Sequence, residues 1–288
     1  MRSYLATSLC GVFMAGCAWF CLWVIAFYFI NDPELAILLF PFSLRLGMTL
    51  HTRTHYWPAI YIAEWGLAIA LALLLDEPQW LTILIASGLS VPATLIAKRY
   101  YSGDLNRHLL VMASLIMVTA LINVAVVSSH VPAVYMVWLV SITGGLMLVP
   151  MCYLVWNYLF QNKWAPLSSY LIHNVVEFKI RHIALYSVLL VASILIQTSL
   201  PDELRRFAPF CMAIPIILLA FRYGWQGALL ATLLNSVALI AAHSGTSKLE
   251  ITDLLLSLSA QTITGILLGL AVQKQKDLNS KLRSELSR

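Results

Sequence analysis

Length, composition and charge already restrict the class of this protein. Its 288 residues are 60% hydrophobic and only 11% charged, whereas an average soluble domain is about 45–50% apolar and about 25% charged. So little charge cannot cover the surface of a soluble globule of this length, which excludes disulfide-rich secreted scaffolds, disordered regulators and nucleic-acid-binding domains. The net charge of +5 has to be located along the chain before it can be interpreted.

Hydrophobic runs that suit a bilayer recur along the whole chain, since a spanning helix needs about 20 apolar residues. The candidates in order are 8–30, 35–50, 57–75, 80–97, 108–127, 135–158, 183–199, 208–220, 226–243 and 251–272. The second and eighth are short, and each has a proline near its start, Pro41 or Pro209, with Pro215 further along the eighth. We predict an all-α polytopic membrane protein of about ten transmembrane helices. Eight helices plus two broken or re-entrant segments form the alternative.

The basic residues are unequally divided between the two sides of this ten-helix arrangement. With the N-terminus in the cytoplasm, fourteen of the eighteen Lys and Arg fall in inner segments and three in outer segments, while Arg45 falls inside a helix. Basic residues are enriched on the cytoplasmic side of membrane proteins. We therefore predict that both termini are cytoplasmic, and the positive charge serves orientation rather than nucleic-acid binding.

Two segments of the chain share the same order of features. Residues 32–57 contain DPEL, FPF and YW, and residues 201–225 contain PDEL, APF and YGW. Pro41 and Tyr56 are 15 residues apart, and Pro209 and Tyr223 are 14 apart. A parallel internal repeat is one interpretation, and chance similarity between apolar segments is the other.

Arg45 and Glu64 are the two ionisable residues that lie clearly inside predicted spans. A charge at the bilayer centre costs about 2.5–3.5 kcal/mol on insertion scales, so such residues are usually paired or functional. At about 1.5 Å rise per residue, both lie roughly 8–11 Å from the inner boundary. We predict that they form an ion pair. The pair could lock two neighbouring helices together, or it could take part in signal transmission or ligand contact.

Glycine and proline mark two other predicted helices. The segment 143–150 carries Gly144, Gly145 and Pro150, which favour either close helix packing or a hinge. The last predicted helix carries Gly265 and Gly269 in a GxxxG pattern, which lets another backbone approach closely. That approach would occur either within the domain or between two copies in a homodimer.

The outer segment between the seventh and eighth predicted helices is unusually charged. It contains Asp202, Glu203, Arg205 and Arg206 within five positions. Adjacent arginines suit an anionic ligand such as a phosphate or an acidic patch on a partner, and a solvated loop with local ion pairs is the alternative. No catalytic motif is present, and the seven histidines show no metal-ligand spacing. We therefore assign no catalytic residue, metal or cofactor to this chain.

A helical pattern continues past the last predicted span. Residues 272–288 contain no proline or glycine, and Leu278, Leu282 and Leu286 fall on one stripe between charged residues. We interpret 1–272 as a membrane-integral domain and 273–288 as the start of a cytoplasmic signalling helix or coiled coil. An amphipathic tail on the inner leaflet is the alternative. Because the stripe stops abruptly, we expect the chain to continue in a longer protein.

Six sequence blocks carry a resemblance to a known family. They are LLFPFSLRLGM (38–48), YWPAIYIAEW (56–65), TGGLMLVPMC (143–152), LPDELRRFAPFCMAIPI (200–216), YGWQGALLATLLN (223–235) and LLLSLSAQTITGILLGLAVQ (254–273). They closely resemble the membrane-integral sensor domain of the hexose-phosphate uptake sensor histidine kinases, within the bacterial membrane-associated sensor class. The positions that match the family pattern are Pro41, Arg45, Gly47, Trp57, Glu64, Trp65, Gly144, Gly145, Pro209, Phe210, Gly224, Trp225 and Gly227.

The resemblance implies a sensor in the bacterial inner membrane that belongs to a two-component system. Such a sensor works with a transporter-like membrane partner that detects external glucose 6-phosphate, and its last helix relays the signal to a kinase core that acts on a response regulator. No phosphoacceptor or ATP-binding domain falls within these 288 residues, so ATP and Mg²⁺ would belong only to that core. The alternatives are a secondary transporter, or a domain that binds the sugar phosphate directly through Arg205 and Arg206.

Overall fold

The structure is a computed structural model that describes residues 2–76, 81–101, 105–127, 134–160, 188, 191–192, 195, 199, 208–242 and 248–286. Helices make up nearly all of these residues, and none of them lies in a β-strand. The predicted all-α class is therefore confirmed. The chain forms two compact units, one of Met1–Tyr153 with Gly245–Leu256 (unit 1) and one of Leu154–Ser244 with Ser257–Arg288 (unit 2).

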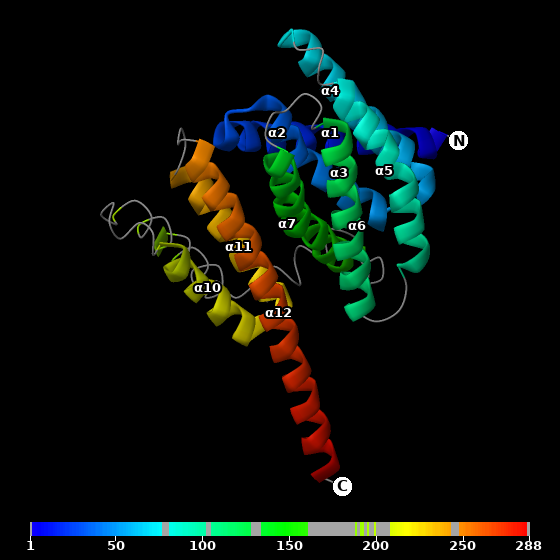
Figure 1. The fold of residues 1–288 in the computed structure, drawn as a ribbon. Helices are drawn as coiled ribbons and strands as arrows, with labels where there is room; N and C mark the ends of the chain where they lie inside the picture. The colour runs from blue at the N-terminus through cyan, green and yellow to red at the C-terminus, as the bar shows by residue number, and fades with distance from the viewer. Residues whose placement is uncertain are drawn as a thin grey trace. The chain divides into compact units, whose positions relative to one another are not determined.

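Unit 1 begins with a long helix, α1 (Arg2–Ile30), and a sharp change of direction (Figure 1). Asn31 adopts φ +54°, and its N–H donates to the carbonyl of Phe27 at 2.8 Å, which ends α1 in a left-handed cap. The carboxylate of Asp32 then accepts from the N–H groups of Glu34 and Leu35 at 3.1 and 3.2 Å. Pro33, which has no N–H to leave unpaired, therefore opens the next helix, α2 (Pro33–Leu39).

The second predicted span consists of two short helices rather than one. α2 ends at Leu39, and α3 (Pro41–His51) begins one residue later. Proline cannot donate an intrahelical hydrogen bond, so Pro41 interrupts one helix and starts another. In the most apolar part of Pro33–His51, 83% of the residues are buried, compared with 22% in that of Ser8–Ile30. This broken segment therefore belongs to the core of unit 1, whereas α1 lies at its periphery.

Four further helices complete unit 1, together with the first turns of α12. After the short 3₁₀ helix Thr54–Tyr56 come α4 (Trp57–Leu74), α5 (Leu81–Tyr100), α6 (Leu105–Val127) and α7 (Val134–Phe160), the last of which continues into unit 2. α3 contacts α1, α2, α4 and α5. The buried α3 therefore occupies the position in unit 1 where side chains from several helices can meet.

Unit 2 is built on α10 (Ala208–Tyr223), α11 (Trp225–Ala242) and most of α12 (Lys248–Leu286). Pro209 is the second residue of α10, where its lack of an N–H costs nothing, while Pro215 lies inside that helix. Phe210 follows on the same helix. The core of this unit consists of small and branched apolar residues, namely Ile216, Leu219, Ala220, Ala228 and Ala231, with Leu268 packed against them.

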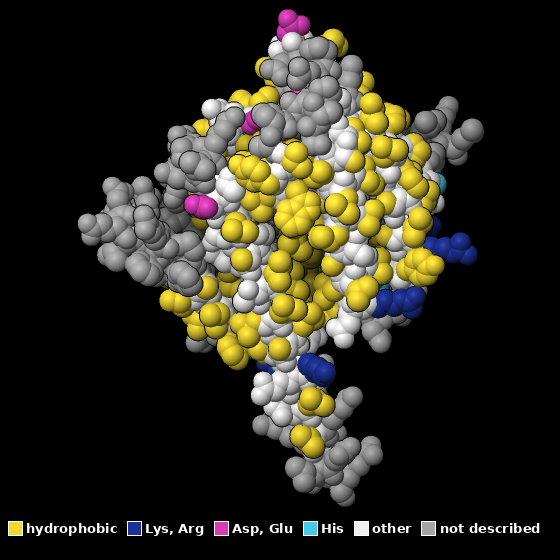
Figure 2. Space-filling view, viewed as in Figure 1, with side chains coloured by type: hydrophobic (Ala, Val, Ile, Leu, Met, Phe, Trp, Pro, Cys, Tyr) yellow, Lys and Arg dark blue, Asp and Glu magenta, His cyan; other side chains and the backbone are white. Residues whose placement is uncertain are grey.

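Six described helical segments are long and apolar enough to cross a bilayer: Ser8–Ile30, Pro33–His51, Thr54–Leu74, Leu105–Val127, Val134–Trp156 and Ile251–Lys276. Among the side chains coloured by type in Figure 2, hydrophobic ones predominate. The predicted spans 80–97, 208–220 and 226–243 are also helical and correspond to α5, α10 and α11. These three helices are not among the six candidate spans. α10, for example, has 16 residues, or about 24 Å. The run 183–199 lies almost entirely outside the described residues, so ten helices, the eight-helix alternative and the repeat stay predictions.

Candidate functional site

The candidate site lies in unit 1, where α3, α4 and α5 contribute polar side chains to an otherwise apolar interior. Pro41 restarts the helix, which places Arg45 on the second turn of α3. Glu64 lies on α4. Arg45 is 1% exposed and Glu64 is 2% exposed. Charges buried this deeply are stable only when paired and hydrogen-bonded, so their partners define the site.

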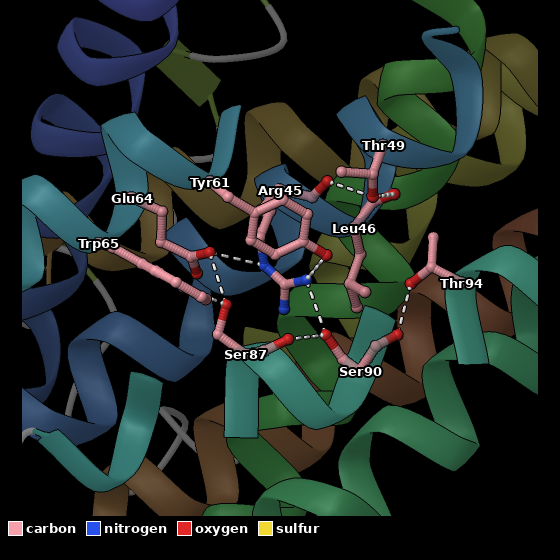
Figure 3. A network of polar contacts seen from close by, with 9 residues as sticks. All are labelled: Arg45, Leu46, Thr49, Tyr61, Glu64, Trp65, Ser87, Ser90 and Thr94. Atoms are coloured by element: carbon pink, nitrogen blue, oxygen red, sulfur yellow. Dashed lines mark hydrogen bonds and ion pairs between the residues drawn. The ribbon is translucent and has the colours of Figure 1, made fainter. Parts of the chain in front are cut away.

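Arg45 and Glu64 form an ion pair, as the sequence predicts. The Nε atom of Arg45 lies 2.9 Å from Oε2 of Glu64 (Figure 3). The two residues sit on helices joined by a short connection, and their similar predicted depths agree with this contact. The contact shows that the pair links α3 to α4. A role of the pair in signalling or ligand contact stays a prediction.

The rest of the guanidinium group is also held on several sides. Its Nη1 atom donates to the hydroxyl of Tyr61 at 3.0 Å and to the hydroxyl of Ser90 at 2.7 Å. The ring of Phe42 lies 4.2 Å from Cζ, close enough for a cation–π interaction. Arg45 therefore joins its own helix to α4 through Tyr61 and to α5 through Ser90.

The carboxylate of Glu64 extends the same network towards α5. The hydroxyl of Ser87 donates to Oε2 at 2.8 Å and accepts from the indole N–H of Trp65 at 3.1 Å. The hydroxyl of Ser90 donates in turn to the carbonyl of Ser87 at 2.6 Å. We call Arg45, Tyr61, Glu64, Trp65, Ser87 and Ser90 the Arg45 network. Because these hydrogen bonds and the ion pair lie in a low-dielectric interior, the network couples the three helices.

A second polar contact closes the C-terminal end of α3. The ammonium group of Lys98, on α5, donates to the carbonyls of Thr49 (3.3 Å) and Thr52, and lies 5.3 Å from the ring of Trp57. The indole N–H of Trp57 donates to the carbonyl of Thr49 at 2.9 Å. A cation is favourable where helix carbonyls are left unpaired. Burial lowers the pKa of Lys98 from its usual range.

Sequence reasoning found the two charges of the network and missed most of their partners. Ser87, Ser90 and Thr94 are spaced three and four residues apart and are fully buried on α5. That spacing places them on one face of a helix, and a polar face in an apolar span is a signal that could have predicted them. Tyr61 had no such signal, because an aromatic residue in a span is ordinary.

The glycines of α3 and α7 mark close contacts inside unit 1. A Cβ atom at Gly144 would collide with the carbonyl of Leu39, at the break between α2 and α3. A Cβ at Gly145 would lie 2.6 Å from Ile116, and one at Gly47 would lie 2.6 Å from Cys152. α7 stays helical through Pro150. These contacts favour the packing interpretation of segment 143–150 over the hinge interpretation.

The glycines of unit 2 have a corresponding role. Gly224 joins α10 to α11 at φ +70°, a conformation that L side chains rarely adopt. A Cβ atom at Gly269 would collide with the backbone of Trp225, and one at Gly265 would lie 2.9 Å from Ile216. The GxxxG pattern therefore packs within the unit, which favours the intramolecular interpretation over the dimer. Gly227 and Trp225 are buried on α11.

The prediction for the charged outer segment receives no structural information. Asp202, Glu203, Arg205 and Arg206 all lie outside the described residues, so anion or partner binding by them stays a prediction. Within the described ranges, no three His, Cys, Asp or Glu side chains group closely enough to hold a metal ion.

The helices, the spans and the buried network together define a multi-pass helical membrane domain. Comparison of sequences identifies its class: residues 7–276 match the MASE1 family of membrane sensor domains, and the chain belongs to that family. The chain is also 41% identical, over 286 residues, to the signal transduction histidine-protein kinase/phosphatase UhpB of Salmonella typhimurium strain LT2. That alignment covers 99% of this chain and 57% of the relative's length. No solved structure matches the chain.

Proposed function

We propose that this chain is the sensory domain of a UhpB-like histidine kinase and that it acts through its last helix. It would lie in the bacterial inner membrane with both termini in the cytoplasm, as the excess of basic residues in the inner segments supports. A transporter-like membrane partner that detects external glucose 6-phosphate would supply the signal. In the full-length protein, a kinase core that phosphorylates a response regulator would receive it.

The continuity of α12 is the observation that carries this proposal. The helix extends for 39 residues, from Lys248 to Leu286, and includes the candidate span Ile251–Lys276. Beyond that span it continues as a polar segment on which Leu278 and Leu282 are 53% and 56% exposed. A continuous helix transmits rotation or translation along its axis. α12 therefore suits the transfer of a change in the membrane domain to whatever follows it.

Insertions into α12 test this relay in the full-length protein. Two residues inserted between Lys276 and Asp277 rotate the following leucine stripe by about 200°, whereas seven residues rotate it by only about 20°. We expect the two-residue insertion to abolish or lock the transcriptional response to external glucose 6-phosphate. The seven-residue insertion should preserve it. Equal responses from the two variants, at equal protein levels, would contradict a relay that depends on helix orientation.

Partner binding is tested separately by co-purification with the transporter-like protein. The variants are Arg45→Glu, Glu64→Arg and the double exchange, which restores opposite charges. If the network holds the conformation that the partner recognises, each single variant loses binding and response, and the double variant regains part of both. Well-folded single variants that bind and signal normally would remove the ion pair from the proposal. Uptake of glucose 6-phosphate by this domain alone in liposomes would favour a transporter instead.

A further inference from the structure

A small cavity lies beside the Arg45 network, between α1, α3 and α4. Trp19 and Ala15 line it from α1, Arg45 and Met48 from α3, and Glu64 from α4, together with other apolar side chains. It has room for the oxygen of about one water-sized molecule. Trp19, which takes no part in the Arg45 network, is 2% exposed.

Three buried polar atoms of residues around this cavity have neither a hydrogen-bond partner nor an ion-pair partner in the described part of the chain, whereas Nε of Arg45 contacts Glu64 only as an ion pair. The three atoms are Nε1 of Trp19, Nη2 of Arg45 and Oε1 of Glu64. The network occupies the other atoms of the ion pair: Nε and Nη1 of Arg45 bind Glu64, Tyr61 and Ser90, and Oε2 of Glu64 binds Arg45 and Ser87. Buried polar atoms are normally satisfied by protein or by ordered water.

The chemistry of these three atoms selects the ligand. Two of them are N–H donors and the third is a carboxylate acceptor. A small anion would accept from Trp19 and Arg45 but would meet the carboxylate of Glu64, and a cation would meet the guanidinium group of Arg45. A neutral hydroxyl oxygen accepts two hydrogen bonds and donates one, which matches the set. Among ligands with such an oxygen, the small volume of the cavity suits a single water molecule.

We propose that this cavity is a binding site for one ordered water molecule that bridges Trp19 to the Arg45–Glu64 pair. The water accepts from Nε1 of Trp19 and Nη2 of Arg45 and donates to Oε1 of Glu64. It thereby gives Nη2 of Arg45 and Oε1 of Glu64 a partner and extends the network from three helices to four by including α1. This site does not depend on the signalling role proposed above.

Indole N–H resonances test the site directly in the intact chain reconstituted in nanodiscs. We expect the Trp19 N–H, assigned by its loss in Trp19→Phe, to show a magnetisation-transfer cross-peak to a long-lived water. The matched control is Trp57, which is also buried but whose N–H donates to the carbonyl of Thr49, and which should show no such peak. A Trp19 N–H without a water cross-peak, or equal peaks for both residues, would overturn the proposal.

A thermal-stability comparison provides an independent test. Trp19→Phe should lower the apparent Tm by about 2–4 °C in the natural background. The loss should vanish when Arg45→Met and Glu64→Met have already removed the pair. Trp23→Phe is the control, because the Trp23 N–H donates to the carbonyl of Pro33 on α2, and its effect should be the same in both backgrounds. An unchanged cost of Trp19→Phe without the pair would contradict a bridge.

Discussion

The helix pairs α3–α4 and α10–α11 share a local plan and are stabilised differently. Both begin with a proline in the first turn of the leading helix, Pro41 or Pro209. In both, the second helix starts at a tryptophan, Trp57 or Trp225. The similarity predicted from the sequence therefore extends to the places where helices begin, although a common origin of the two segments stays a prediction.

The two helix pairs carry different residues at the positions of the ion pair. Counting from the prolines, Arg45 corresponds to Ala213, and counting from the tryptophans, Glu64 corresponds to Thr232. The hydroxyl of Thr232 donates to the carbonyl of Ala228 in its own helix and needs no partner elsewhere. The first pair is thus joined to its surroundings by a charged network, and the second by close packing of small residues and backbone.

The connections follow the same division. In the segment between α3 and α4, the carbonyl of Thr52 accepts from Lys98, and in the last turns of α3 the carbonyl of Thr49 accepts from Lys98 and Trp57. Between α10 and α11 stands Gly224 alone, whose N–H donates to the carbonyl of Ala220 at 2.8 Å. Polar side chains complete one connection, and the conformational freedom of glycine completes the other. The same local plan can therefore rest on electrostatics or on packing.

The largest expected effect comes from breaking the ion pair. Arg45→Met leaves the carboxylate of Glu64 buried and uncompensated, which should lower the free energy of unfolding by about 3–5 kcal/mol. SDS titration in mixed micelles measures this loss. Ala213→Met, the control at the corresponding and partly exposed position, should change stability by less than about 1 kcal/mol, because it leaves no buried charge unpaired. Equal losses from the two variants would erase the difference between the helix pairs.

Overpacking should be the corresponding weakness of unit 2. Gly269→Val places a side chain against the backbone of Trp225 and should cost about 1–3 kcal/mol. Gly66→Ala on α4 is the control, because nothing lies within 4 Å of its new Cβ. We expect that control to be neutral or to stabilise by up to about 1 kcal/mol through helix propensity. The same titration measures both, and a neutral Gly269→Val would contradict close packing of α12.

Removal of single hydroxyl groups sharpens the comparison. Ser87→Ala deprives both Glu64 and Trp65 of a partner and should cost about 1–3 kcal/mol. Thr232→Val removes only a bond to a carbonyl within its own helix, so we expect less than about 1 kcal/mol. Chemical denaturation of the two variants in the same micelles measures the difference. A larger loss of stability from Thr232→Val than from Ser87→Ala would contradict the conclusion that polar contacts between helices stabilise unit 1 more than unit 2.

The smallest effect should be a dependence of stability on alkaline pH through Lys98. Burial lowers the pKa of Lys98 in the folded protein, so the unfolded chain binds more protons between that value and about 10.4. Stability should therefore rise with pH across this window. The measurement is the apparent Tm from pH 7 upwards, and Lys98→Met should flatten the slope. A slope of the opposite sign would mean that the carbonyl contacts of Lys98 outweigh its burial.

Much of this architecture could be predicted without coordinates. Composition determines the membrane class because charged residues are too few for a soluble surface. Hydrophobic run length predicts where helices lie, since a bilayer requires about 20 apolar residues per crossing. Pro41 predicts a break because it lacks an N–H. The pairing of Arg45 with Glu64 could be predicted because a buried charge needs an opposite charge, and only one stood at a similar depth on a neighbouring helix.

The remaining features depend on side chains that are distant in sequence. Ser87 and Ser90 become partners of the ion pair only because α5 packs against α3, and a serine in an apolar helix does not reveal which helix it will face. Lys98 similarly reaches the end of α3 across 46 residues. The carbonyl of Leu39, which favours close packing over a hinge at Gly144, comes close to that glycine only through tertiary packing. Local chemistry thus sets the elements, and contacts between them select their partners.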